Sequence, residues 1–359
     1  LIIYFQYEAP AFSFLANVAA VPLATCAFTL AFLLIFLPYT VFHEAISWMI
    51  QGVLWISRQS YGMLTIGHVP FLWVLLFYFM TGLWIWKKNG QNRHIRISLA
   101  YVIMIILIWI PMARRKSLAF LDVGQGDCFV ADTKSGAIIF DGGSSSEDQV
   151  GRYRILPYMK YLGYQKIQIA VISHMDIDHY SGIKELLEMG KIKYLGLPEI
   201  PKDATMKKII GIAKKRGTTI FYLSRGRQIT TKDGSLKVLH PQKNSQMEKN
   251  AASLVMQGKI LGYRVLLTGD VEKEGEEELL SEELERADIL KAAHHGSKNS
   301  TSNEFLQKVQ PKQTVISCGK QNRYGHPHLE TIHRLQTYHT KIYRTDRSGA
   351  IIFFKRRDG

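Results

Sequence analysis

The sequence predicts an α/β domain of mixed sheets with helices on the outside, preceded by a helical membrane region. One observation is a sharp change of composition near residue 116. Residues 1–116 carry eight basic and two acidic residues (net +6), whereas the other 243 residues hold 37 basic and 28 acidic ones (net +9). A second is that apolar runs in the later region first come in hairpin-like pairs and then alternate with helical patterns. We therefore expect two regions, 1–116 and 117–359.

The first region is predicted to lie in a membrane. About 20 apolar residues span a bilayer core, and three uncharged stretches approach or exceed that length, namely 12–37, 69–86 and 97–112. Pro22 would kink or break the first helix, which is tolerated where neighbouring helices cover the freed backbone. Residues 39–63 place apolar residues at helical spacing with polar ones between, so a helix in the interface or inside a bundle is expected there.

The net charge and the cysteine spacing of the chain limit which partners and which kinds of site are expected. The net charge of +15 suits a polyanionic partner or an anionic membrane surface, although a basic face without a specific partner carries the same excess. Cys26, Cys128 and Cys318 form no CxxC or CxxxC pair, which argues against a disulfide framework or a thiolate zinc knuckle. The opening "LIIYFQ" lacks Met, a basic n-region and a small-residue cleavage site, so we interpret it as a fragment of a longer protein.

Strands are predicted in the second region wherever apolar residues run between turn residues. Residues 117–133 form a strand, a Gly-rich turn and a second strand, and 136–143 form a strand that ends in Asp141-Gly-Gly. Residues 165–179 are a buried strand that runs directly into a dense polar cluster. Further strands are expected at 191–200, 235–240, 253–270, 287–297 and 313–319, and a final hairpin at 341–357 with Ser348-Gly349 at its turn.

Helical spacing recurs between these strands. Residues 180–190 form a helical pattern that stops at Gly190, and 205–217 form an amphipathic one closed by Gly217. Two more are expected at 272–284 and 328–339. Early strands in hairpins and later strands that alternate with helices indicate a mixed sheet arrangement with the helices on the outside.

Polar residues stand just past the ends of several apolar runs, at Asp141, His174, Asp270 and His294. A strand-end Asp is more often a cap or a turn residue. Four such positions in one chain nevertheless indicate a site, because α/β sites are assembled where strands end and the chain turns.

The stretch "SHMDIDHYSG" holds the densest chemistry in the chain. Its H-x-D-x-D-H cluster consists of His174, Asp176, Asp178 and His179, all side chains that bind first-row divalent metals. Strand alternation would send residues 174, 176 and 178 to one side, and a turn after 178 would bring His179 beside them. The competing interpretation is a polar loop whose Asp and His residues are turn and capping residues.

Four ligand groups are too many for one open catalytic ion and therefore predict two ions, with further ligands from elsewhere. Asp270 in "LLTGD" would bridge the ions with its two oxygens, and His295 in "AAHHGS" would cap one of them. Two such ions activate water and hold the attacking and leaving oxygens of a phosphoester displacement.

These motifs carry a family resemblance. "SHMDIDHYSG", "LLTGD" and "HHGS" resemble the metal motifs of the metallo-β-lactamase superfamily, whose usual cluster is H-x-H-x-D-H. Together with "FLDVGQGDCFV", "IIFDGG", "NAASLVMQGKILGYRVLLTGD", "LKAAHHGSKNSTS" and "CGKQNRYGHPH", they resemble the C-terminal domain of the ComEC family of DNA-internalisation competence proteins. The upstream "FSFLANVAAVPL" resembles the last part of that family's membrane domain, so the resemblance covers nearly the whole chain.

The resemblance implies a metallo-β-lactamase-like αββα sandwich at 117–359, preceded by the C-terminal part of a polytopic, channel-forming membrane domain at 1–116. It implies a role in carrying single-stranded DNA across the bacterial cytoplasmic membrane, with the sandwich domain a nuclease on the strand that is not imported. Implied partners are single-stranded DNA, the lipid bilayer and other proteins of the uptake machinery, and a homo-oligomer stays open.

Carried over residue by residue, the resemblance implies six metal ligands, namely His174, Asp176, Asp178, His179, Asp270 and His295. His294 would face the substrate as an acid for the leaving oxygen, with Asp178 as its catalytic partner. Asp141 would orient the cluster from outside the ligand set. Substrate contacts are expected from Asn250, Ser297, Lys298 and His326; for Ser297 and Lys298 an ordinary solvated loop is the alternative.

Two departures from the superfamily pattern affect the choice of metal. Asp176 stands where a second histidine is usual, and Asn250 stands near the place of the histidine that usually precedes the bridging Asp. The nearest other histidine, His240, reads more simply as a strand-end residue before a proline. One site would then hold Asp178, His179, Asp270 and His295, and the other His174, Asp176 and Asp270. Oxygen-rich ligation favours Mn²⁺, with Zn²⁺ as the alternative.

The second region is expected on the outer face of the cytoplasmic membrane. The 87–96 loop is short and holds four basic residues, so by the positive-inside rule it is cytoplasmic, and one crossing by 97–112 places the rest outside. The basic residues at 114–116 argue the other way. Two other functions stay open: a domain that only guides DNA, and a membrane-attached phosphodiesterase that acts on lipid or cell-wall polymers.

Overall fold

A computed structural model provides the structure of the chain. It describes residues 2–10, 13–34, 40–58, 63–86, 115–248, 250–282 and 284–356, together with residues 95, 98, 99 and 102. The chain divides into two compact units, Leu1–Met112 and Ala113–Gly359.

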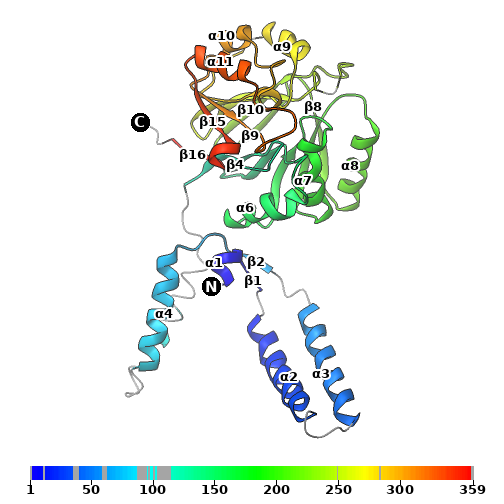
Figure 1. Ribbon diagram of the computed structural model, residues 1–359, viewed down its shortest axis with the longest axis vertical. Coiled ribbons are helices and arrows are strands. Elements are labelled where there is room, and N and C mark those ends of the chain that lie inside the picture. Colours follow the sequence, from blue (N-terminus) through cyan, green and yellow to red (C-terminus); the bar gives the residue numbers. More distant parts are fainter. Residues whose placement is uncertain are drawn as a thin grey trace. The chain divides into compact units, whose positions relative to one another are not determined.

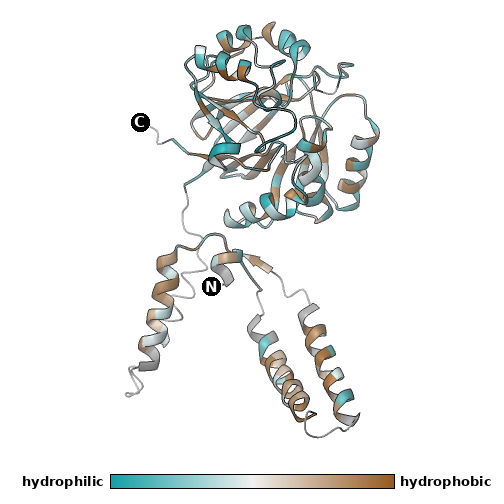
Figure 2. Cartoon of the chain, in the orientation of Figure 1, coloured by the Kyte–Doolittle hydropathy of each residue, from teal (hydrophilic) through white to brown (hydrophobic). Residues whose placement is uncertain are grey.

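The first unit is mainly helical. Its elements are α1 (Ile2–Gln6), β1 (Glu8–Pro10), α2 (Ser13–Leu33), α3 (Thr40–Arg58), β2 (Met63–Thr65) and α4 (Phe71–Trp86). The two short strands pair antiparallel, with Glu8 opposite Thr65. α2 and α3 lie side by side (Figure 1), and hydrophobic residues dominate α2, α3 and α4 (Figure 2).

The helices of this unit fall close to the predicted segments. α2 continues through Pro22 to Leu33, so the proline does not break it. α3 confirms the helix expected between the first two apolar stretches. The predicted stretch 97–112 lies almost wholly outside the described residues. Among the residues that the structure describes, no helix combines the length and the apolar character that crossing a membrane requires.

Two seven-stranded sheets form the centre of the second unit. The first sheet runs in the order β16 (Ile351–Phe354), β3 (Ser117–Phe120), β4 (Phe129–Thr133), β5 (Gly136–Phe140), β6 (Ile167–Val171), β7 (Ile192–Pro198), β8 (Thr219–Leu223). The second runs β15 (Lys341–Arg344), β14 (Gln313–Ile316), β13 (Ile289–Lys291), β12 (Tyr263–Leu267), β11 (Val255–Ile260), β10 (Gly234–His240), β9 (Gln228–Thr231). Both sheets begin with antiparallel hairpins and continue with parallel strands, which confirms the predicted mixed arrangement.

Helices cover the outer face of each sheet (Figure 1). The first sheet is covered by α6 (Leu156–Tyr161), α7 (Ile177–Glu188) and α8 (Ala204–Lys215), and a π-helical turn, η1 (Gly151–Ile155), precedes α6. The second is covered by α9 (Lys273–Leu280), α10 (Asn303–Val309) and α11 (Leu329–Thr337). A 3-10 turn, η2 (Ala293–Gly296), follows β13, and α12 (Thr345–Ser348) links β15 to β16.

Strand alternation divides the apolar side chains among three cores. In β3, Leu118 and Phe120 belong to the cluster between the two sheets, whereas Ala119 packs into the cluster under α6–α8. A third cluster lies beneath α9–α11 and includes Phe305 and Leu335. Three separate apolar clusters between four layers confirm the αββα sandwich.

The predicted hairpin at 341–357 is wrong. β15 pairs parallel with β14 in the second sheet, whereas β16 pairs antiparallel with β3 in the first, with Ile351 opposite Phe120. α12 occupies the expected turn. Local turn residues could not reveal this crossover, because the strand that receives β16 begins more than 200 residues earlier in the chain.

Candidate metal centre

Three tight turns at the ends of first-sheet strands build one wall of the centre. The turn before β4 carries Asp127, whose backbone N–H donates to the carbonyl of Asp178 (3.0 Å), and Gly143 after β5 donates to the carbonyl of Asp127 (3.1 Å). A Cβ atom at Gly143 would stand only 2.6 Å from the backbone of Asp178 and His179. Glycine is therefore required here, because this backbone packs directly against the start of α7.

The H-x-D-x-D-H motif is a strand-to-helix turn. β6 ends at Val171 and α7 begins at Ile177, so Asp178 and His179 lie in the first turn of a helix. The expected strand alternation of residues 174, 176 and 178 is therefore wrong, because the chain has left the strand before the motif begins. The rings of His174 and His179 nevertheless lie close together, with centroids 4.1 Å apart.

Four buried side chains converge at the centre. Among the described residues, the one group whose ligand atoms all lie within 4.8 Å of one another consists of Asp127, His179, Asp270 and His295. Oδ2 of Asp270 is 3.2 Å from Nε2 of His179 and 3.4 Å from Nε2 of His295. The structure thus brings three predicted ligands together and adds Asp127, which the motif argument did not include.

The other nitrogen of each histidine is held by an acceptor. Nδ1 of His179 lies 3.0 Å from Oδ2 of Asp141, whose other oxygen accepts from the backbone N–H of Ser173 (2.7 Å). Nδ1 of His295 lies 2.9 Å from the carbonyl oxygen of Ser317. Acceptors at Nδ1 hold the proton on that nitrogen and turn Nε2 toward Asp270, the orientation found in metal-binding histidines. Asp141 thus contacts a ligand in the way expected of it.

These Nε2 atoms fit a metal ion. Both are fully buried and have no hydrogen-bond partner, and a buried polar atom without a partner is costly. Two imidazole nitrogens and the carboxylate of Asp270 on one side of a pocket are a suitable donor set for a first-row divalent ion.

A buried lysine completes the cluster. Lys291, on β13, is 4% exposed. Its ammonium contacts Oδ2 of Asp127 and lies 3.0 Å from the carbonyl oxygen of Gly269 and 3.5 Å from Oδ1 of Asp270. An ammonium has three donors, and each faces one oxygen. Oδ1 of Asp270, which was expected to bridge to a second ion, therefore faces a fixed positive charge.

The cluster shifts the pKa values of its members. Burial alone would raise the pKa of Asp127, but the charges of Lys291 and His295 outweigh it and hold that pKa at about 2. Burial lowers the pKa of His295, but Asp270 and Asp127 outweigh it and raise the value to about 10. Despite its burial, Lys291 has a raised pKa because the two carboxylates outweigh desolvation. In the absence of a metal, the cluster thus concentrates negative charge that protons and Lys291 must balance.

The remaining residues of the motif lie beside the four-residue cluster. Asp178 places Oδ2 3.3 Å from Nε2 of His295. Nδ1 of His174 lies 3.0 Å from the hydroxyl of Ser173, and its Nε2 lies 3.6 Å from Oδ2 of Asp176, which is partly exposed. Asp178 thus stands at the edge of the cluster, and His174 and Asp176 form a separate pair.

His294 stands next to the centre and is held by an acid that the motifs did not reveal. Its Nε2 lies 3.8 Å from Oδ2 of Asp270, and its Nδ1 lies 2.9 Å from Oε1 of Glu272. His294 and His295 both have left-handed backbone (φ 48° and 54°), a conformation that costs about 1–3 kcal/mol in non-glycine residues. This turn directs two consecutive histidines to different partners.

A cavity of about 430 Å³ opens onto the centre. Its lining includes Asp178, Asp270, His294 and His295 together with the predicted His326, so the structure brings these residues to one pocket. His326 has a pKa lowered to about 4, because burial and the charges of His295 and His294 disfavour its protonated form. The pocket therefore combines metal donors with neutral and ionised groups that can handle protons.

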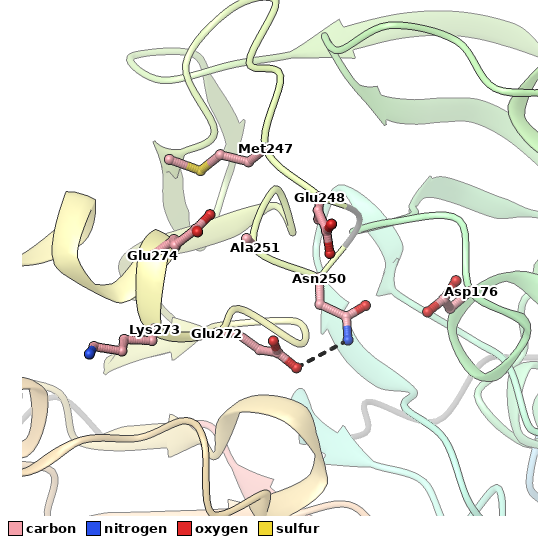
Figure 3. A pocket seen from close by; sticks show the side chains of 8 residues that line it. All are labelled: Asp176, Met247, Glu248, Asn250, Ala251, Glu272, Lys273 and Glu274. Atoms are coloured by element: carbon pink, nitrogen blue, oxygen red, sulfur yellow. Dashed lines mark hydrogen bonds between the residues drawn. The ribbon is translucent and has the colours of Figure 1, made fainter.

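A larger cavity of about 910 Å³ is lined by Asp176 and by Glu272, the acid that contacts His294 (Figure 3). Asn250 lines it, with its amide nitrogen 3.4 Å from Oε1 of Glu272. Glu248, Glu272 and Glu274 also line it, together with Lys273. These carboxylates would repel a phosphate, so the smaller pocket is the better phosphate site.

Ser297 and Lys298 lie away from the smaller pocket. Ser297 is buried, and its backbone N–H donates to the carbonyl of His294 (2.8 Å). Lys298 lines a third cavity beside Glu276, Glu277 and Glu304. The structure does not bring either residue to the metal pocket; Ser297 instead supports the histidine turn.

The motifs missed four residues that shape the site: Gln125, Asp127, Glu272 and Lys291. Gln125 and Asp127 lie in "VGQGD", and the position of this Gly-rich turn just before a strand was the available signal. Lys291 was concealed because a lysine in an apolar run resembles a strand residue with an exposed end. Nothing in the sequence paired Glu272 with His294, since that pairing depends on how the two turns pack.

Known proteins share these features. A model of the metallo-beta-lactamase superfamily matches residues 121–320. ComE operon protein 3 of Bacillus subtilis (strain 168) is 33% identical over 294 residues, which cover 76% of this chain and 38% of that protein. Competence protein ComA of Neisseria gonorrhoeae is 31% identical over 66% of this chain and 32% of its own length. Recombination protein 2 of Haemophilus influenzae is 27% identical over 74% of this chain and 32% of its own length. The chain thus spans about a third of the length of these curated relatives.

Proposed function

The chain belongs to the metallo-β-lactamase superfamily and, within it, to the ComEC family of competence proteins, and on this basis we propose that it acts in DNA uptake across the bacterial cytoplasmic membrane. Residues 117–359 would form a metal-dependent nuclease that hydrolyses phosphodiester bonds of the strand that is not imported. Other proteins of the uptake machinery and further copies of the chain are proposed partners.

The convergence of two imidazole nitrogens on Asp270 beside an open pocket carries this proposal. Nε2 of His179 and of His295 both lie within 3.4 Å of one carboxylate oxygen and have no hydrogen-bond partner. A guiding domain without catalytic activity would not need two buried imidazoles and a carboxylate gathered next to a cavity, since burying such polar groups costs folding free energy.

His179, Asp270 and His295 would hold the ion, which when bound would activate a water molecule and polarise a phosphoryl oxygen. Asp178 lines the pocket; despite its burial, the hydrogen bond to His295 and the charge of His179 lower its pKa, so its carboxylate is ionised at neutral pH and would orient the attacking water and take up its proton. His294 would donate a proton to the leaving oxygen, with Glu272 fixing its ring.

Lys291 would take the place of a second ion. Its ammonium neutralises Asp127 and Oδ1 of Asp270, the oxygen that a bridging role would require. We therefore propose one tightly held ion per chain instead of two. Mn²⁺ stays the proposed metal and Zn²⁺ the alternative; with two imidazole nitrogens and one carboxylate, the donor set is less oxygen-rich than the sequence predicted, which brings Zn²⁺ closer to Mn²⁺.

The surface beside the pocket suits a polyanion. Thr205, in the first turn of α8, lines the metal pocket. The rest of that helix and the residue after it expose basic side chains, namely Lys207, Lys208, Lys214, Lys215 and Arg216. Basic side chains along a helix attract phosphate backbones in a salt-dependent manner, which supports nucleic acid as the substrate.

The first unit is proposed to lie in the membrane as part of a multi-pass domain. Support comes from the apolar stretches and from large apolar side chains that stay exposed in this unit, such as Phe28 (75%), Trp48 (75%) and Leu72 (73%). Exposed apolar surface of this kind marks a membrane or a protein interface.

The nuclease domain is proposed to lie on the outer face. The test places a single cysteine at the exposed Lys232 in protein whose three native cysteines are replaced, and treats intact protoplasts with a membrane-impermeant thiol reagent. Labelling of intact protoplasts is expected. Labelling only after lysis would place the domain inside.

The proposed activity is tested with residues 113–359, which form a compact unit with their own cores. Chelated protein is assayed on single-stranded DNA with Mn²⁺, Zn²⁺ or Mg²⁺, and Asp178→Ala serves as the inactive control. Cleavage with Mn²⁺ that this substitution abolishes is expected. Loss of all cleavage with every ion would favour the guiding role, and hydrolysis confined to lipid or cell-wall phosphodiesters would favour the membrane-attached phosphodiesterase.

A further inference from the structure

A planar pair of side chains stands at the rim of the metal pocket. Tyr324 lines the 430 Å³ cavity together with Asp178, His294 and His295, yet 43% of its surface stays exposed. The guanidinium of Arg323 lies over the hydroxyl end of the tyrosine ring: its central carbon is 4.9 Å from the ring centroid, and one of its nitrogens donates to the tyrosine hydroxyl (2.7 Å). Neither residue has a role in the chemistry described above.

The loop that carries this pair is held in one conformation. The amide nitrogen of Asn322 donates to the carbonyls of Gly319 (3.0 Å) and His326 (2.6 Å). Its oxygen accepts from the backbone N–H groups of Tyr324 (3.2 Å) and His326 (3.0 Å). One buried end of the loop is fixed by Gln125, whose side-chain oxygen accepts from the N–H of Gly319 (3.0 Å). A loop fastened in this way loses little entropy when a ligand binds.

A row of flat side-chain rings extends from the metal centre to the rim of the pocket. The ring of His326 lies 5.4 Å from that of His294 and stacks on Tyr324 at 5.7 Å with an interplanar angle of 21°. A substrate whose phosphate enters the pocket would therefore pass its neighbouring group along Tyr324 and Arg323. A flat group is the natural occupant, because aromatic rings and guanidinium planes both stack on nucleobases.

An unpartnered donor lines the same pocket. Gln125 is 2% exposed, and its side-chain nitrogen has no hydrogen-bond partner. This amide group can donate to an oxygen of a phosphate placed at the centre. The pocket thus has a polar donor, the amide of Gln125, on the inside and the planar groups of Arg323 and Tyr324 at its rim. This order matches the order of phosphate and base in a nucleotide.

We propose that Arg323 and Tyr324 form a stacking subsite for one unpaired nucleobase next to the scissile phosphate; this rests on the proposed nuclease function. The subsite selects single-stranded nucleic acid, because the bases of a duplex are stacked on each other and do not reach a side chain. A lipid or cell-wall phosphodiester has no flat group for this surface, so the subsite also separates the substrate classes.

The experiment measures binding and cleavage of two labelled 12-residue oligonucleotides of equal charge by the full chain in detergent. One is oligothymidylate, and the other carries tetrahydrofuran abasic residues in place of the nucleotides. Binding is measured by fluorescence anisotropy in chelator, so that cleavage does not interfere. The wild type is expected to bind the thymidylate about tenfold more tightly, since one stacked base contributes about that factor.

Matched variants locate the effect. Tyr324→Leu is expected to remove the preference for bases and Tyr324→Phe to keep it, whereas Arg323→Lys keeps the charge and reduces the preference. Tyr153→Leu is the control, because Tyr153 is exposed (63%) but does not line the pocket; its preference should equal that of the wild type. An unchanged metal content and melting temperature of Tyr324→Leu show that the loss is local.

The outcomes distinguish this proposal from the nuclease function. Equal binding of both oligonucleotides by the wild type, or a base preference that survives Tyr324→Leu, overturns the subsite even if DNA is cleaved. A base preference without any cleavage supports the subsite while the nuclease function fails. Binding of anionic phospholipid vesicles with no binding of either oligonucleotide overturns the subsite as well.

Discussion

The two halves of the H-x-D-x-D-H motif meet very different surroundings. His179 is wedged between Asp141 on one nitrogen and Asp270 on the other, with His295 and Asp127 nearby. His174, five residues earlier and equally buried, contacts Ser173 and the partly exposed Asp176. Like residues in one short motif therefore contribute unequally, because a ligand becomes effective only when other turns bring donors to it. The predictions below test this inequality.

The largest difference is expected between Asp270→Ala and Asp176→Ala. Asp270 faces three histidines, so its loss should reduce metal affinity by more than the ~10–100-fold that changes around a metal site typically cost. Asp176 lies beside His174 and is not one of the four clustered side chains, so its loss should leave the tight ion in place. Metal content after dialysis, measured by elemental analysis, compares the two. If Asp176→Ala lost the ion and Asp270→Ala retained it, Asp176 and not Asp270 would be the ligand of the tightly bound ion.

Replacing the buried ammonium of Lys291 should make the two halves of the H-x-D-x-D-H motif more alike in metal binding. In Lys291→Met, Asp127 and Oδ1 of Asp270 lose their cation, so the metal-free protein should be destabilised by about 3–5 kcal/mol. Excess Mn²⁺ should restore most of that stability, and the variant should bind one ion more per chain than the wild type. Chemical unfolding with and without Mn²⁺, together with native mass spectrometry, checks both. An unchanged ion count would show that Lys291 does not stand in for a metal.

Asp141→Asn tests whether Asp141 orients His179, the histidine of the motif that belongs to the four-residue cluster. The amide can no longer accept as a carboxylate does at Nδ1 of His179, so metal affinity should fall by about 10–100-fold. The same exchange at Asp132, which contacts Lys116 and Tyr164 far from the centre, should leave affinity unchanged and serves as the matched control. Equal affinities of Asp141→Asn and wild type would remove Asp141 from the support of the centre.

The smallest expected effect concerns the pH dependence of metal affinity. The pKa of His295 is raised to about 10 in the absence of metal, mainly because Asp270 and Asp127 outweigh its burial. Its imidazole is therefore protonated at neutral pH and must lose that proton to bind an ion, so affinity should rise with pH up to about 10, by at most about tenfold per pH unit for each proton. Calorimetric titration in buffers of different ionisation enthalpy counts the released protons. A count of zero between pH 7 and 8 would contradict this coupling.

The sequence determined much of the domain by itself. Apolar runs with turn residues between them located most strands, and helical spacing located α7, α8, α9 and α11, because burial imposes those periods locally. Motif chemistry identified His179, Asp270 and His295, since few residue types bind metals. The helices at 151–161 and 303–309 were missed because their apolar spacing is short and irregular.

Tertiary structure alone decided the partnerships at the centre. Asp127 and Glu272 lie in two different turns and Lys291 at the end of β13, and only the meeting of strand ends from two sheets places them against Asp270 and His294. The same holds for β16, whose partner strand lies at the other end of the domain. Local periodicity reports which face of an element is buried, but it carries no information about which distant element covers that face, and so it could not show that a lysine fills the place expected of a second ion.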